Sequence, residues 1–91
     1  MTKHCWQIRG FDSTVKIYER EVPIGCLSDT QVKELLRCLV SRGLSYDEIV
    51  GACARRRSKI ANSLLEINKD GPHPVYTCGT NPHFIARVVD R

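Results

Sequence analysis

Two helix starts of the same kind stand close together in this chain and constrain its fold more than any other feature. Ser28 is followed three residues later by Gln31, and Ser45 is followed three residues later by Glu48. In this pattern the serine hydroxyl accepts a hydrogen bond from the backbone of the third helical residue, whose side chain bonds back to the serine N–H. Because only a few residues around Gly43 separate the two helices, the sequence predicts neighbours that pack at a sharp angle.

The first helix carries one apolar stripe. Its apolar residues recur at intervals of three and four, namely Val32, Leu35, Leu36, Leu39 and Val40. That spacing predicts one buried face. Gly43 is expected to end the helix in the left-handed conformation. The predicted buried side of the second helix comprises Ile49, Val50, Ala52 and Cys53.

Strands are expected on both sides of this helical pair. Residues 4–22 predict a β-hairpin, since apolar and polar side chains alternate around Trp6 and a polar turn separates two β-rich runs. Pro23 would end the second strand, because proline donates no hydrogen bond to a ladder. Residues 75–78 and 84–89 predict strands after a turn at 69–72, although a short helix after residue 82 is the alternative. Residues 58–67 fit either a helix or a strand.

The sequence therefore predicts one α+β domain over residues 1–91, with an N-terminal β-hairpin, a capped αα unit and a C-terminal β-hairpin of two or three strands. A chain of 91 residues has the size of one domain, and its 42% hydrophobic residues are typical of a globular protein. Four aromatic residues are expected in its core, although on an exposed sheet they could stack bases: Trp6, Tyr18, Tyr76 and Phe84.

Positive charge is concentrated in the middle of the chain. Residues 28–59 hold seven basic and four acidic residues, against a formal charge of +4 for the whole chain. The densest run comprises Arg55, Arg56, Arg57 and Lys59. Clustered cations focus the potential that attracts an anionic partner. A solvated helix end would also favour cations, because they stabilise the helix dipole. Both interpretations stay open.

The segment GLSYDEIV at residues 43–50 resembles the GLSxxEIA segment that opens the helix-turn-helix of LuxR-type regulators. The resemblance covers about residues 27–67 and implies a recognition helix near residues 58–67 that enters the DNA major groove. The side chains that it would direct to DNA are Arg56, Arg57, Ser58, Lys59, Asn62 and Ser63. Arginine can bond guanine and asparagine can bond adenine. The chain departs from the family pattern at Arg55, where the family buries an apolar residue, and at Gly51, which weakens the bracing helix.

Residues suited to metal binding or catalysis are few. His73, Cys78 and His83 are candidate metal ligands, but three widely spaced ligands do not match the paired spacing of zinc sites. A cysteine thiol could in principle be activated by His4, His73 or His83, but nothing in the sequence favours one cysteine over the others, and no phosphate loop or hydrolase motif occurs. The chain is therefore expected to be no enzyme and to need no cofactor.

The expected function is that of a small regulatory module which binds nucleic acid through a basic helix-turn-helix-like unit. Its expected contacts are Arg55, Arg56, Arg57, Ser58, Lys59 and Asn62. The alternative is a protein–protein interaction module, an inhibitor or adaptor, that docks an acidic partner surface. A homodimer would suit the first function, because helix-turn-helix proteins commonly read two half-sites.

A reducing, cytoplasmic setting is also expected. The chain has five cysteines without a CxxC pair, and residues 1–10 contain no apolar run typical of a secretory signal. No apolar segment approaches the ~20 residues that a membrane helix needs.

Overall fold

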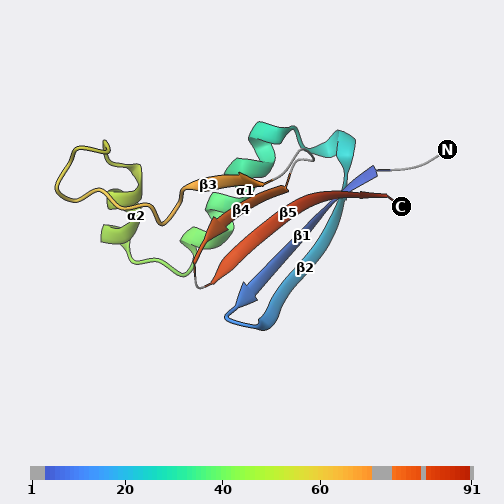
Figure 1. Ribbon diagram of the computed structural model, residues 1–91, viewed down its shortest axis with the longest axis horizontal. Coiled ribbons are helices and arrows are strands. Elements are labelled where there is room, and N and C mark those ends of the chain that lie inside the picture. Colours follow the sequence, from blue (N-terminus) through green and yellow to red (C-terminus); the bar gives the residue numbers. More distant parts are fainter. Residues whose placement is uncertain (1–3, 71–74, 81, 91) are drawn as a thin grey trace.

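The computed structural model describes residues 4–70, 75–80 and 82–90. These residues form an α+β fold, as predicted (Figure 1). Its elements in chain order are β1 (His4–Asp12), β2 (Val15–Pro23), the 3-10 turn η1 (Ile24–Cys26), α1 (Asp29–Ser41), α2 (Tyr46–Cys53), β3 (Ile67–Asp70), β4 (Val75–Gly79) and β5 (His83–Asp90). No helix within the described ranges is long and apolar enough to cross a membrane.

All five strands belong to one antiparallel sheet with the order β2-β1-β5-β4-β3. The N-terminal hairpin joins the C-terminal strands through the pairing of β1 with β5, which places Cys5 opposite Val89 and Phe11 opposite His83. The sequence predicted an N-terminal and a C-terminal hairpin but not the pairing that joins them. The alternative of a short helix after residue 82 is wrong, because β5 begins at His83.

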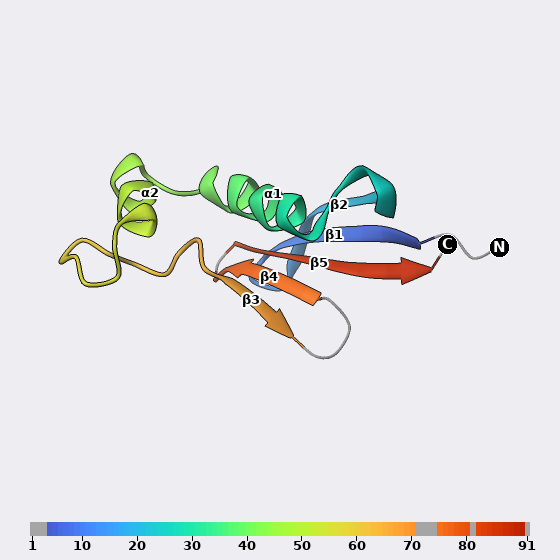
Figure 2. The ribbon, with the colours of Figure 1, turned by 90° about the horizontal axis from the view of Figure 1, so that it is seen from above.

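Helix α1 covers one face of this sheet (Figure 2). Val32, Leu36 and Val40 of its apolar stripe are buried, and α1 packs against β4 and β5. The sheet side of the core comprises Trp6, Ile8, Tyr76, Cys78, Phe84 and Ala86. The core prediction is therefore confirmed for three of the four aromatic residues, while Tyr18 is half-buried at the margin of the core.

Two hydrogen bonds from the sheet fix the start of α1. The indole N–H of Trp6 donates to the carbonyl oxygen of Leu27 at 3.0 Å, and the hydroxyl of Tyr76 donates to Asp29 Oδ2 at 2.6 Å. The bond to Asp29 and burial both raise the pKa of Tyr76. The phenol therefore keeps its proton at neutral pH, and this stabilisation is lost only as the pH rises through the raised pKa. The predicted capping box at Ser28 is present as well.

Helix α2 follows with its own capping box, as predicted, but it lies beyond the end of the sheet (Figure 2). Its predicted buried side is wrong in part, since Val50 is 56% exposed and Cys53 is also exposed. The spacing of the apolar residues indicated an apolar face on α2, but little of the chain packs against that face. The left-handed cap expected at Gly43 does not form either, because the one described glycine with positive φ is Gly79. Instead, the Gly43 N–H donates to the carbonyl of Val40 and tightens the last turn of α1.

Candidate nucleic-acid interface

Residues 54–66, here called the basic loop, connect α2 to β3 and contain neither helix nor strand. Four basic side chains are exposed in this loop, namely Arg55, Arg56, Arg57 and Lys59. The loop and α2 form the end of the molecule that lies farthest from the two chain termini (Figure 1). The structure therefore presents the densest basic run at a projecting end.

The recognition helix that the LuxR-type resemblance implies is not formed, and the strand alternative holds only from Ile67 onward. Local side-chain hydrogen bonds explain this. Ser58 Oγ accepts from the Ile60 N–H at 3.3 Å, and Asn62 Oδ1 accepts from the Leu64 N–H at 3.1 Å. Serine and asparagine side chains that bond nearby backbone groups in this way compete with helical hydrogen bonding. The helical spacing of the apolar residues here was insufficient to overcome that competition.

Asn62 holds the basic loop against α2. Its Nδ2 donates to the carbonyl of Glu48 at 3.0 Å, and its backbone N–H donates to the carbonyl of Gly51 at 3.1 Å. The far end of the loop is fixed as well, because Arg37 Nε donates to the Leu65 carbonyl at 3.2 Å. The Asn62 amide, predicted as an adenine contact, is thus already used within the fold. Both polar atoms of the amide form hydrogen bonds within the fold, so the bidentate contact with adenine would compete with the bonds to Glu48 and Leu64.

Gly51 lets the loop approach the helix so closely. Gly51 is buried, and a Cβ built on it would lie 2.5 Å from the carbonyl oxygen of Ile60 and 2.5 Å from Asn62 Nδ2. Atoms at that separation overlap, so a larger residue cannot occupy this position without moving the loop. The glycine that departs from the LuxR-type pattern therefore has a structural reason in this chain.

Gly51→Ala should detach the loop from α2 rather than unfold the sheet. Alanine is the better helix former by about 1 kcal/mol, but the clash with Ile60 costs more than that gain, typically about 1–3 kcal/mol. We expect amides of residues 46–62 to exchange with deuterium faster, while amides of β1 and β5 keep their protection. Ser63→Ala in the same loop is the control, because it leaves the Gly51 contact intact and should preserve protection. Unchanged exchange in the Gly51 variant would contradict this view of the loop.

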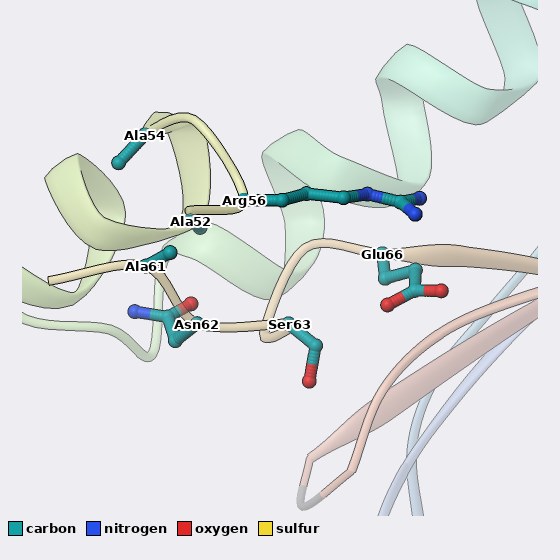
Figure 3. Close-up of a pocket in the computed structure, with 7 residues that line it drawn as sticks. All are labelled: Ala52, Ala54, Arg56, Ala61, Asn62, Ser63 and Glu66. Atoms are coloured by element: carbon teal, nitrogen blue, oxygen red, sulfur yellow. The ribbon is translucent and has the colours of Figure 1, made fainter. Parts of the chain in front are cut away.

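A hollow of about 610 Å³ opens between α2 and the returning loop (Figure 3). Three small residues line one part of it, namely Ala52, Ala54 and Ala61. The polar lining comprises Arg56, Asn62, Ser63 and Glu66. Figure 3 shows the Arg56 side chain extended away from α2. Arg56 and Asn62, both predicted to contact nucleic acid, therefore line the same hollow.

The cations of the basic loop are unpaired within the described ranges. The ion pairs found there join other residues: His4–Asp90, Arg9–Glu19, Lys16–Glu19 and Arg37–Glu34. No carboxylate lies within 4.0 Å of the charged atoms of Arg55, Arg56, Arg57 or Lys59 in this part of the chain. Their positive charge is therefore available to an anionic partner.

The candidate metal ligands are not assembled in the described part of the chain. Cys78 is buried beneath α1, and burial raises the pKa of its thiol. On the paired strands, Cys78 lies opposite Phe84, and His83 lies opposite Gly79 at the next position. The His83 ring stacks on Phe11, with ring centroids 5.5 Å apart. Successive strand residues point to opposite faces, so the side chains of Cys78 and His83 diverge. His73 lies outside the described residues. Among those that are described, no group of three ligands could hold a metal ion.

The sequence reasoning missed a second hollow, on the sheet face opposite α1. It measures about 230 Å³ and is lined by Gln7, Arg9, Phe11, Val75, Ile85 and Arg87. Arg87 Nε donates to Gln7 Oε1 at 2.8 Å, and Arg9 Nε donates to Glu19 at 2.6 Å. The alternation in residues 5–11 and 83–89 was the available signal. It could be used only once β1 was known to pair with β5.

No family model, curated protein or solved structure matches this chain. The function is therefore inferred from the residues of the site and their geometry.

Proposed function

We propose that this protein is a nucleic-acid-binding module whose basic loop contacts the phosphate backbone. One observation carries the proposal: four cations within five residues are exposed on a projecting loop, with no carboxylate partner among the described residues. Phosphate groups suit such a cluster, because arginine can donate to two phosphate oxygens at once. Exposure leaves these cations hydrated and ready to replace condensed counterions.

The contacts of the proposed complex differ from those of a recognition helix. A loop without regular structure cannot lie along the major groove as a helix does, and the Asn62 amide is already bonded to Glu48. Phosphate contacts position a protein on nucleic acid but carry no direct sequence information. The proposed binding is therefore strongly dependent on salt and only weakly dependent on sequence.

Arg56→Ala/Arg57→Ala should weaken binding and flatten its salt dependence. Each phosphate contact on duplex DNA contributes about −0.9 to the slope of log K against log salt, so two lost contacts should reduce that slope by about 1.8. On the same basis, affinity at about 0.1 M salt should fall roughly 60-fold. Fluorescence anisotropy with a labelled duplex, repeated over several salt concentrations, measures both quantities.

A matched control removes the same charge elsewhere. Arg20 and Lys69 are exposed on strands, outside the basic loop, so Arg20→Ala/Lys69→Ala should change the slope much less. Equal slopes for the two double variants would overturn the proposal, as would an absence of binding at low salt. Polyglutamate tests the alternative of an acidic protein partner. If it displaces the duplex as effectively as unlabelled nucleic acid of equal charge, the protein-interaction function is favoured instead.

A further inference from the structure

Large apolar side chains are exposed on β2, on η1, on α2 and in the basic loop, and two of these places, on α2 and on β2, are suited to a contact. On α2, Tyr46 is 89% exposed and Val50 is 56% exposed. On β2, Ile17 is 52% exposed. Scattered apolar residues are normal on a surface, but apolar groups gathered at a hollow or on one helix face often mark an interaction site. Each of these two places has such an organisation.

The exposed Ile17 on β2 lines a groove. It has a volume of about 350 Å³ and lies between β2, the end of α1 and the start of β5. Its apolar lining comprises Ile17, Tyr18, Leu39, Pro82 and Phe84, and the exposed Arg42 also borders it. The groove exists because α1 packs on β4 and β5 and leaves the β2 side of the same sheet face uncovered. We call it the β2 groove.

The second place is an exposed face of helix α2. Tyr46 and Val50 are one helical turn apart, and residues at that spacing lie on the same face. Asp47 is also exposed, and it borders this face because it lies three residues before Val50. This face therefore offers an aromatic ring, a branched aliphatic side chain and a carboxylate.

The charged members of the two surfaces are complementary and unpaired. Neither Arg42 nor Asp47 has an ion pair or side-chain hydrogen bond with another residue of the described ranges. Within one chain they do not pair with each other, since no contact within 4.0 Å joins them. A carboxylate on the helix and a guanidinium at the groove can be paired if the helix comes from another molecule.

We propose that the β2 groove binds α2 of a second copy of this chain, so that two copies form a reciprocal dimer. Tyr46 and Val50 of one copy occupy the apolar groove of the other, and Asp47 pairs with Arg42 across the contact. Because every copy carries both the helix and the groove, the contact forms twice and closes around a twofold axis. The exposed edge of β2 is a poorer site for self-association, because charged side chains and the irregular register at Gly10/Phe11 disrupt edge-to-edge pairing.

Charge reversal at the contact tests this dimer. Sedimentation equilibrium of the full chain, from micromolar to millimolar concentration, should yield a mass approaching twice 10.3 kDa. Arg42→Glu and Asp47→Arg should each leave a monomer, because each places like charges opposite one another. The double variant Arg42→Glu/Asp47→Arg restores opposite charges and should restore the dimer. Tyr46→Ala should weaken association by about tenfold or more, since aromatic anchors dominate such contacts.

Lys69→Glu on β3 is the matched control, because it reverses an exposed cation outside the groove. It should leave the dimer intact, and circular dichroism should show the same fold for every variant. A wild-type protein that stays monomeric at all concentrations would overturn the proposal. So would a double variant that remains as monomeric as the single variants. A mass that grows beyond the dimer would indicate an open chain of copies and would exclude the closed arrangement.

Discussion

Replacing Trp6 with alanine should lower the free energy of unfolding by about 3–5 kcal/mol, the usual cost of removing a large buried aromatic side chain. Trp6 is 1% exposed within the core, and its ring centroid lies 6.1 Å from that of Tyr76. Its removal leaves a cavity and an unpaired carbonyl at Leu27. Urea denaturation followed by circular dichroism measures the loss.

Trp6→Phe separates these two effects. The phenylalanine ring keeps most of the apolar contact but cannot donate to the Leu27 carbonyl, so its cost should include about 1 kcal/mol for the lost hydrogen bond. We expect the phenylalanine variant to lie between wild type and the alanine variant. If Trp6→Ala were as stable as wild type, the burial of Trp6 in the core and its hydrogen bond to Leu27 would be wrong.

Gly10→Ala should destabilise the protein by about 1–3 kcal/mol, because it overpacks a filled core. A Cβ at Gly10 would lie 2.3 Å from Phe84 Cε2, so the ring across the β1–β5 pair must move. Gly25→Ala is the matched control: nothing lies within 4 Å of its Cβ position. The control should change stability by less than about 0.5 kcal/mol.

A double-mutant cycle identifies Phe84 as the cause of the Gly10 effect. Phe84→Leu removes the ring that the new methyl group would meet, so the double variant should be more stable than the sum of the two single effects predicts. Residues in contact show coupling energies of about 0.5–3 kcal/mol. Strict additivity would mean that the Gly10 effect arises elsewhere, for example from the strand backbone.

Local signals predicted most elements of this fold, although β3 extends to Asp70, where the sequence predicted the start of a turn. Non-local packing explains much of what these signals missed. The capping boxes at Ser28 and Ser45 are confirmed because the partners of each cap lie three residues away. The pairing of β1 with β5 joins the two ends of the chain and leaves no such local pattern. The apolar face of α2 was located by its periodicity, but periodicity does not reveal whether another element covers that face.

The candidate site could be predicted in part for the same reason. The cationic cluster is read directly from residues 55–59, and its exposure follows from its composition. The absence of a recognition helix depended on a balance between helical spacing and the side-chain bonds of Ser58 and Asn62. The β2 groove depended on which strands α1 covers, and that is decided by the order of the strands in the sheet.

The separation of the buried core from the basic loop has an evolutionary consequence. Core residues lie between α1 and the sheet, whereas the cations lie on a loop attached at Asn62 and Leu65. Substitutions among Arg55, Arg56, Arg57 and Lys59 should therefore change the proposed binding of nucleic acid at little cost in folding free energy, as expected for exposed positions. A handful of surface codons is therefore enough to change the proposed affinity for an anionic partner, whereas substitutions on the packed face of the sheet cost folding free energy.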